Sequence, residues 1–294
     1  MRRPIIVAFF SFALMACQVL AAERGALFKV SGHGHTLYLY GTIHAGKPDY
    51  YPLEPHIAKA VAAAPTLALE VDTARDPGAV QAAFARHGVF AAGSPGYAGL
   101  PGERRRRLEA ALKQQGVDLA AVMQLKPWML ATMLTVRDLA RLGYDPAFGV
   151  DAHLAGLARG KARIAELESS EYQAALLDRL PLAMQWDLLE ETLAHMASGR
   201  QLREARELFE AYERADRQAL ERIAARIDSD DSVSGKFVRE IVLDERNGPM
   251  AERLAALLAR DDNAVAAIGL MHLLGKGGVP VLLRQRGMQV ERIY

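Results

Sequence analysis

Cysteine is almost absent from this chain of 294 residues, and the single copy, Cys17, lies near the N-terminus. One thiol cannot form a disulfide within the chain, so a disulfide-stabilised fold is excluded. Cys17 also falls in a segment with the pattern of an export signal. The mature protein is therefore expected to have no cysteine nucleophile and no Cys-ligated zinc.

A surplus of either charge is missing as well. The chain has 36 basic and 35 acidic side chains, which leaves a net charge of +1. Binding to a phosphate backbone needs a basic surplus on one face, so we expect no nucleic-acid partner. The run Arg104-Arg105-Arg106-Arg107 stands at an expected helix start, where it indicates a solvated face.

Long apolar runs are missing too. The uncharged run Ile5–Cys17 is shorter than the about 20 residues that a membrane span needs. It follows two arginines and precedes small residues, which is the pattern of a secretory signal. We therefore predict a signal peptide over residues 1–22, with cleavage after Ala21 or Ala22, and a periplasmic or secreted protein. The alternative is a lipoprotein, because Leu14-Met15-Ala16-Cys17 resembles a lipobox and would leave a lipid anchor on Cys17.

What the chain does have is apolar residues, 51% of the total, which is enough for a full core. Alternating or continuous apolar runs predict strands at both ends of the mature chain, and helical periodicity dominates the middle. The strands are expected at residues 26–31, 36–40, 66–71, 162–167, 263–268 and 289–293. We predict one α/β domain over residues 23–294, with a central mixed β-sheet built from N- and C-terminal segments and a large helical insertion at about 76–240.

Two of these expected strands end in the same pattern. The stretches 37-LYLYGTIHAG-46 and 265-VAAIGLMHLLG-275 each leave the strand through Gly-x-x-His, and 228 residues separate His44 from His272. A third strand, TLALEV, carries Glu70 near its end. Ligands of open α/β sheets bind beyond the carboxyl ends of the strands, so these three side chains are expected to meet there.

Two imidazoles and one carboxylate are a typical ligand set for a divalent metal ion. We expect His44, Glu70 and His272 to hold an ion of the Mn, Co or Zn class, which would lower the pKa of bound water and make hydroxide available. A purely structural role for these residues stays open, since a single His at a strand end is commonly a hydrogen-bonded structural residue and Glu70 could simply pair with an Arg.

The chain also resembles the TraB/GumN family, which includes the Tiki-type metalloproteases. The resemblance covers nearly the whole mature length and rests on motifs in order, namely LYGTIH (39–44), YYPL (50–53), LALEVD (67–72), KPWML (126–130), GYDPAFGVDAHL (143–154), ELES (166–169), ERN (245–247) and GLMHLLG (269–275), with a terminal RGMQVERI. It implies His44, Glu70 and His272 as the metal centre, and Glu245, Arg246 and Asn247 as supporting catalytic residues.

The ERN motif has chemistry of its own. Arg246 could stabilise an oxyanion, because guanidinium stays charged and offers fixed donors. Asn247 could orient a ligand His, and Glu245 could act as a metal ligand or carry protons. Gly248-Pro249 follows at once and is expected to interrupt the helix.

Four further polar residues are second-rank candidates. Asp151 stands near an expected helix start, where it would cap the helix or interact with its dipole, and His153 would hydrogen bond to a neighbour. Glu166 and Glu168 end a short expected strand and could face the same crevice.

From these residues we expect a metal-dependent hydrolase in which activated water attacks a peptide or small ester carbonyl, with Glu70 as ligand or general base. One alternative is a non-catalytic binding or scaffold protein used in envelope assembly or polysaccharide export. Another is a metal-free esterase in which His44 is the general base. The sequence does not distinguish substrates, metals or oligomeric states.

Overall fold

The computed structural model describes residues 22–294. Cys17 and all but the last residue of the predicted signal peptide lie outside this part of the chain. Six strands form one mixed sheet in the order β4-β3-β5-β2-β1-β6. The strands are β1 (Leu27–Gly32), β2 (His35–Thr42), β3 (Thr66–Leu69), β4 (Arg163–Glu166), β5 (Ala264–Gly269) and β6 (Gln289–Arg292).

The sheet joins both ends of the chain, as predicted. Strands β2, β5, β3 and β4 run parallel, whereas β1 is antiparallel to its neighbours β2 and β6. All four residues of β3 are buried, and so are the first five of β5, which matches their continuous apolar sequences, since parallel strands are covered on both faces. The second-last strand of the chain, β5, thus lies in the middle of the sheet.

The first two strands form a β-hairpin. Gly32 pairs with His35, and the two turn residues between them, His33 and Gly34, have φ angles of 55° and 80°. Two successive positive φ angles are the mark of a type I′ turn, whose twist suits a two-residue hairpin.

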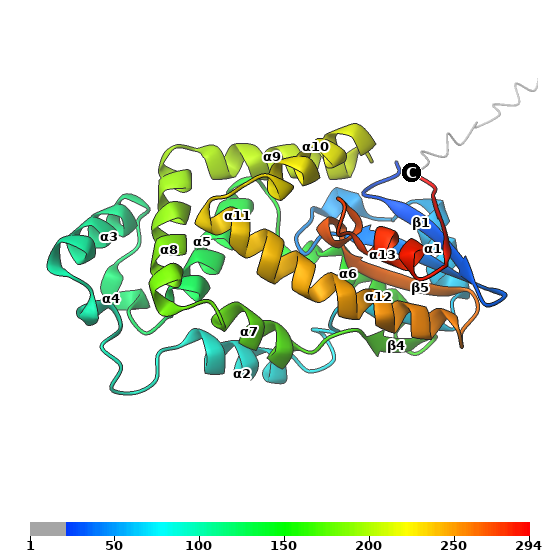
Figure 1. Ribbon diagram of the computed structural model, residues 1–294, viewed down its shortest axis with the longest axis horizontal. Coiled ribbons are helices and arrows are strands. Elements are labelled where there is room, and N and C mark those ends of the chain that lie inside the picture. The colour runs from blue at the N-terminus through cyan, green and yellow to red at the C-terminus, as the bar shows by residue number, and fades with distance from the viewer. Residues whose placement is uncertain (1–21) are drawn as a thin grey trace, which may run out of the picture.

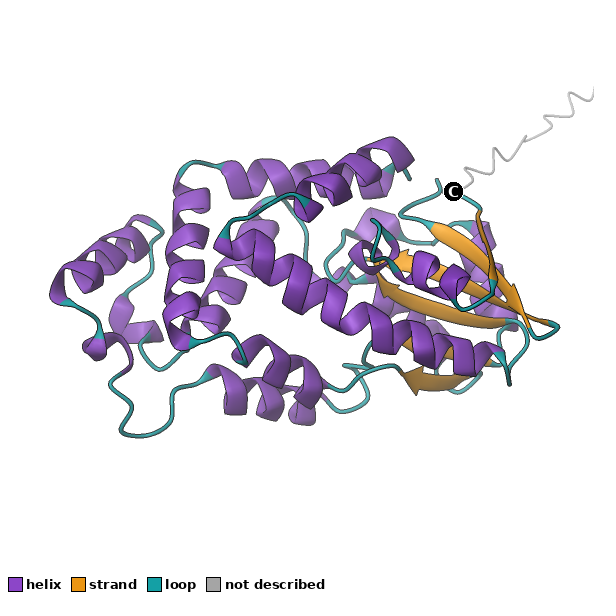
Figure 2. Ribbon diagram, viewed as in Figure 1, coloured by secondary structure: helices purple, strands orange, loops and turns teal. Residues whose placement is uncertain are grey.

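Helices surround the sheet on both faces and extend far beyond it (Figure 1; Figure 2). Several begin with Pro in the first turn or with an Asp or Ser side chain accepting a backbone N–H, both of which favour a helix start. The helices are α1 (Pro55–Ala63), α2 (Pro77–Gly88), α3 (Gly102–Gln114), α4 (Leu119–Val122), α5 (Pro127–Arg141), α6 (Val150–Ala158), α7 (Ser170–Asp178), α8 (Leu182–Ala197), α9 (Arg200–Glu213), α10 (Arg217–Asp228), α11 (Val233–Lys236), α12 (Glu245–Leu258) and α13 (Val279–Gln285).

The predicted helical insertion contains one strand, β4, and builds a hydrophobic core of its own. Side chains from α3, α4, α5 and α8 pack around Trp186, Leu130 and Leu112, apart from the core at the sheet. Figure 1 shows these four helices at the end of the molecule that is farthest from the strands.

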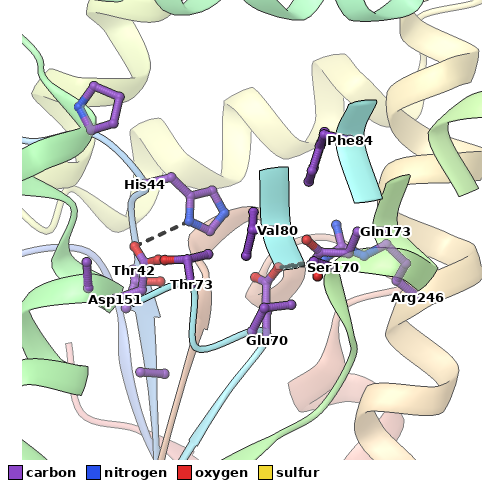
Figure 3. Close-up of a pocket in the computed structure, with 14 residues that line it drawn as sticks. Thr42, His44, Glu70, Thr73, Val80, Phe84, Asp151, Ser170, Gln173 and Arg246 are labelled. Carbon is purple, nitrogen blue, oxygen red and sulfur yellow. Dashed lines mark hydrogen bonds and ion pairs between the residues drawn. The ribbon is translucent and has the colours of Figure 1, made fainter. Parts of the chain in front are cut away.

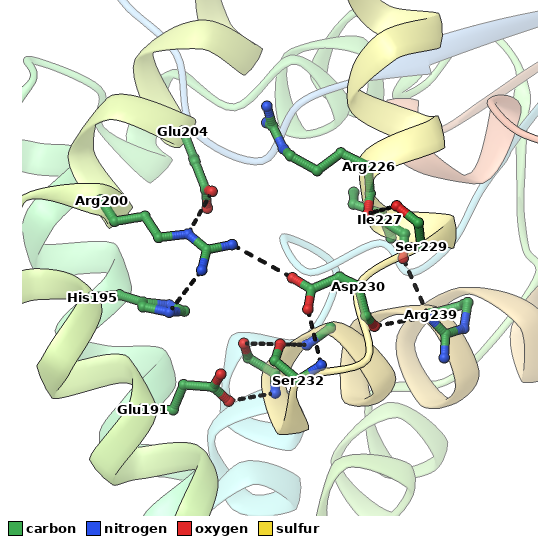
Figure 4. A network of polar contacts seen from close by, with 12 residues as sticks. Glu191, His195, Arg200, Glu204, Arg226, Ile227, Ser229, Asp230, Ser232 and Arg239 are labelled. Carbon is green, nitrogen blue, oxygen red and sulfur yellow. Dashed lines mark hydrogen bonds and ion pairs between the residues drawn. The ribbon is translucent and has the colours of Figure 1, made fainter.

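A polar network ties the insertion to the helix that returns to the sheet (Figure 4). The Arg200 guanidinium donates to Glu204 at 2.8 Å and lies 3.6 Å from Asp230. Arg239 donates to the carbonyl oxygens of Ile227, Asp228 and Asp230, so it fixes the loop between α10 and α11.

That returning helix corrects one prediction, because it does not break at Gly248-Pro249. A π-helix, Phe237–Asp244, leads without interruption into α12, and Pro249 lies inside α12. Proline removes one N–H and crowds the carbonyl one turn earlier, which normally breaks or kinks a helix. Here the chain enters that turn from the wider π-helical segment, which lies immediately before it. None of the helices within residues 22–294 is long and apolar enough to cross a membrane.

Candidate functional site

The parallel strands bring the two Gly-x-x-His motifs to one edge of the sheet. Strand β5 lies between β2 and β3, and Thr42 at the end of β2 pairs with Gly269 at the end of β5. His44, Glu70 and His272 follow the ends of β2, β3 and β5 within three residues. Because β5 lies beside β2, the two histidines come to the same edge of the sheet although 228 residues separate them in the sequence.

Gly269 occupies the centre of this group. A Cβ atom built on it would lie 3.0 Å from Oε1 of Glu70, 3.5 Å from Cδ2 of His272 and 3.6 Å from Nε2 of His44. Its φ angle of −51° is open to any residue, so the backbone does not require glycine here. The missing Cβ instead leaves space among the three predicted ligands.

Gly41, the glycine of the other Gly-x-x-His motif, is needed for close packing. A Cβ there would lie 2.7 Å from Cδ1 of Leu270 and 3.1 Å from Cδ1 of Leu273, both in the 3-10 turn Leu270–Leu273 that carries His272. The absence of a side chain lets that turn pack directly on β2.

The Glu70 carboxylate is buried and held on both oxygens. Oε1 accepts the Gly269 backbone N–H at 2.6 Å and lies 3.8 Å from Nε2 of His272. Oε2 accepts from Arg246 at 2.5 Å and from Gln173 at 3.3 Å. Burial would raise the pKa of this carboxyl, but the nearby His272, His44 and Arg246 charges and the Gly269 N–H outweigh it and hold the pKa at about 2. Glu70 is therefore a carboxylate at neutral pH.

Arg246 joins Glu70 to a second buried carboxylate. It donates through Nη2 to Glu168 at 2.7 Å and through Nε to both Glu168 oxygens at 3.1 Å. Nη1 donates to the Val242 carbonyl of the π-helix at 3.2 Å. One guanidinium thus faces two carboxylates, so this buried trio carries an excess negative charge that attracts a cation.

His272 is buried and has its tautomer set by Asn247. The Asn247 amide nitrogen donates to the Gly277 carbonyl at 2.9 Å, which leaves its Oδ1 to face Nδ1 of His272 at 2.6 Å. Nδ1 therefore carries the proton, and Nε2 presents its lone pair toward Glu70. Burial lowers the pKa of His272 to about 4, despite the Glu70 charge, so the ring is neutral at physiological pH.

The Nδ1 atom of His44 also faces a polar group, in this case a carboxylate. It lies 3.3 Å from Oδ1 of Asp151 in the first turn of α6. The negative charge of Asp151 raises the pKa of His44 to about 9. The ring is 65% exposed, but it faces a cavity of about 380 Å³ (Figure 3).

This cavity has a polar and an apolar wall. The polar wall is formed by His44, Glu70 and Arg246. Opposite it stand Val80 and Phe84, one turn apart on α2, as Figure 3 shows. A ligand bound here would meet charged groups on one side and an apolar surface on the other.

The three side chains of the ERN motif (residues 245–247) do not all point into the site. Arg246 and Asn247 point into the site, the first to Glu70 and the second to His272. Glu245 pairs with Arg179 at 2.6 Å on the surface and makes no hydrogen bond to the other predicted site residues. Three successive helical residues turn by about 100° each, so all three could not face one point.

Of the four second-rank candidates, two belong to the site and two do not. Glu168 and Asp151 belong to the site, and Asp151 does not cap α6, because that helix has no side-chain cap. His153 was expected to hydrogen bond to a neighbour, but it stacks on Tyr51 at 3.9 Å between ring centres. Glu166 faces Arg75 and the Asp72 backbone N–H instead of the cavity.

Two residues in the site had no sequence signal strong enough to identify them. Gln173 on α7 donates to both Glu70 and Glu168, at 3.3 and 2.9 Å. Thr42 lines the cavity at the end of β2. Gln173 is one polar residue among many on a helix, and the role of Thr42 depends on the strand register.

The donor set fits a divalent ion in its chemistry. Nδ1 of His272 faces the Asn247 amide oxygen and Nδ1 of His44 lies 3.3 Å from the Asp151 carboxylate, and metal-ligating histidines commonly have such partners. Nε2 of His44 and Cδ2 of His272 border the Gly269 space. The 3.8 Å between His272 and Glu70 slightly exceeds the about 3.4 Å edge of a tetrahedral site with 2.1 Å bonds. Within residues 22–294 no three His, Cys, Asp or Glu side chains stand close enough to form a ready metal site, so binding by this set requires the side chains to draw together.

Residues 26–292 match the TraB/PrgY/gumN family over nearly the whole described chain. The chain belongs to this family. It is 25% identical over 270 residues to the uncharacterized protein YbaP of Shigella flexneri and to that of Escherichia coli K12, covering 86% of this chain and 89% of each relative. No solved structure matches it.

Proposed function

We propose that this protein is a metal-dependent hydrolase that cleaves peptide or small ester bonds. One observation carries the proposal, namely that two imidazoles, each with a polar group facing Nδ1, and one buried carboxylate border the same space at the carboxyl edge of the sheet. Such a ligand set leaves coordination positions open for water and substrate.

His44 and His272 would hold the ion through Nε2, and Glu70 through Oε1. A divalent ion there would supply Lewis acidity and a water molecule of lowered pKa. The excess negative charge of Glu70, Glu168 and Arg246 supports cation binding. Asn247 keeps His272 in the tautomer that a ligand needs, and Asp151 orients His44.

Arg246 is better placed to orient Glu70 than to stabilise an oxyanion. Its Nε and Nη2 atoms already donate to Glu168 and Glu70, and Nη1 donates to a backbone carbonyl. We infer that the guanidinium holds Glu70 in place, so that Oε1 stays turned toward His272. Gly269 fixes the same oxygen from the other side.

A second candidate is supported by the His44–Asp151 contact. An exposed imidazole backed by a carboxylate can transfer protons without a metal. A pKa of about 9 keeps His44 protonated at neutral pH in the metal-free protein. In this version His44 gives a proton to the leaving group, and Glu70 is the base.

The place of action is part of the proposal. The charged start, the apolar run Ile5–Cys17 and the small residues after it support export to the periplasm or beyond. N-terminal sequencing of the mature protein should find Ala22 or Glu23 first. A diacylglyceryl group on Cys17 would instead establish the lipoprotein.

The deciding experiment measures bound metal and hydrolysis in the same preparation. Protein purified without chelators should contain about one divalent ion per chain, and a chelator should remove both the ion and peptide or ester hydrolysis. Hydrolysis that persists without metal would establish the proton-transfer alternative. Absence of both metal and hydrolysis, with an envelope phenotype that His44→Ala and His272→Ala leave unchanged, would favour a non-catalytic scaffold.

A further inference from the structure

Two apolar side chains of α2 face the cavity that contains His44 and Glu70. Val80 and Phe84 lie one turn apart, so they point the same way, and they are the residues of α2 that line the cavity (Figure 3). The residues of α2 that are buried are Ala83 and Gly88, whereas Val80 and Phe84 are only half-buried. Their remaining apolar surface is therefore open to a ligand.

This apolar wall is held in position from behind. The Phe84 ring packs on the buried Trp128 of α5, with 6.2 Å between the ring centres. The Trp128 indole N–H donates to Asp178 of α7 at 3.3 Å, so the tryptophan is itself fixed. A surface that is in place before the ligand arrives loses little conformational entropy on binding, and such a surface can select between ligands.

The charged side chains near the end of α2 face another way. Arg86 and His87 both pair with Glu171 of α7, each at 2.8 Å. A charged group of a substrate placed against Val80 and Phe84 would therefore lose its water without gaining a partner on α2, which is unfavourable. An apolar group would bind better there, because burying one aliphatic side chain raises affinity about 10- to 100-fold.

The size of the cavity limits the group that α2 can receive. Its volume of about 380 Å³ is near the lower end of the range for ligand cavities, about 300–1,000 Å³. The polar wall of His44, Glu70 and Arg246 takes one side of this volume. The side along α2 therefore suits a single apolar side chain.

We propose that Val80 and Phe84 determine substrate specificity by binding an apolar side chain on the carbon next to the substrate carbonyl. The protein then prefers leucine-like side chains at this position over glycine and over acidic or basic side chains. The inference rests on the proposed hydrolase function for the bond that is cleaved, but the preference itself depends on the cavity alone. With the side chain against α2, the carbonyl faces the polar wall, where the proposed chemistry takes place.

The test uses N-acetyl amino-acid methyl esters that differ only in the side chain, namely those of leucine, glycine, aspartate and lysine. In the wild type, kcat/KM for the leucine ester should exceed each of the other three values about 10- to 100-fold. Val80→Lys should abolish this preference and favour the aspartate ester over the lysine ester, because an ammonium group then faces the bound side chain. Ala82→Lys, at an exposed position of the same helix, is the matched control and should keep the wild-type order.

Binding separates this inference from the proposed function. The corresponding methyl ketones keep the carbonyl and the side chain but cannot be hydrolysed, and calorimetric titration measures their affinities. Val80→Thr keeps the shape of the side chain with little risk to the fold, and it should reduce the ratio of leucine-ketone to glycine-ketone affinity. If no ester is hydrolysed but the wild type binds the leucine ketone about tenfold more tightly and Val80→Thr reduces that ratio, the hydrolase function fails and the inference stands.

Two results would overturn the inference. One is a wild type that binds the leucine and glycine ketones equally, or binds neither. The other is a leucine preference that Val80→Lys and Val80→Thr leave unchanged, since the apolar wall would then take no part in it.

Discussion

His272 donates its Nδ1 proton to Asn247 across 2.6 Å, so a residue of α12 determines which nitrogen of the histidine is free. Asn247→Ala should lower the affinity for a divalent ion about 10- to 100-fold, the usual effect of removing the residue that orients a ligand. Calorimetric titration with Zn²⁺ or Mn²⁺ measures this. Asn263→Ala, at an exposed amide near β5, is the matched control and should bind as the wild type does. Equal affinities for both variants would mean that the tautomer does not matter for binding.

His44→Ala and His272→Ala should each abolish stoichiometric metal binding, because two remaining ligands hold a divalent ion poorly. Elemental analysis of the purified variants checks this. His87→Ala is a suitable control, since His87 pairs with Glu171 on α7 outside the site. Full metal content in either site variant would remove that histidine from the ligand set.

Glu70→Gln separates two roles of the carboxylate. If Glu70 is a ligand, the amide should weaken metal binding strongly, whereas a base that does not touch the ion predicts retained metal and a large loss of kcat. Arg246 keeps its hydrogen bonds to Glu168 in this variant, so the protein should stay folded. Unchanged metal content together with unchanged kcat would exclude both roles.

Arg246→Lys should lower the free energy of unfolding by about 1–3 kcal/mol, since a Lys ammonium cannot bridge Glu70 and Glu168 as the planar guanidinium does. Urea unfolding measures the loss. Arg179→Lys offers a control in an exposed pair with Glu245, where the loss should stay below about 1 kcal/mol. Equal losses in the two variants would show that the buried ion pairs of Arg246 stabilise the fold no more than the exposed Arg179–Glu245 pair does.

Asp151→Asn should lower the pKa of His44 from about 9, because the neighbouring negative charge disappears. NMR titration of the metal-free protein follows this directly, with His153 as an internal reference. A folded-state pKa above the unfolded value of about 6.5 stabilises the fold fully below that value, and the contribution is lost as the pH rises through about 9. The wild type should therefore exceed Asp151→Asn in melting temperature at pH 6, and the difference should fade by pH 10. A His44 pKa that is the same in both proteins would contradict the assignment.

The sequence predicted the site residues that follow strand ends better than the residues that contact them. Apolar runs that stop at Gly-x-x-His identify strand ends without any three-dimensional information, and parallel strands must place those ends together. The direction of the Arg246 side chain could not be predicted, because Pro249 suggested a break where the structure has a continuous helix. The contact of Asp151 with His44 depends on how α6 packs, and the neighbours of Thr42 depend on a register that no local pattern encodes.

The central place of β5 has a consequence for the order in which the protein is made. The ribosome makes the chain from its N-terminus, and β2 and β3 emerge long before residues 264–269, which must lie between them. Until that segment arrives, the two early strands have no shared neighbour, and His272 is not yet present. The last part of the site is therefore made last, so a chain whose synthesis has not reached residue 272 has no complete site.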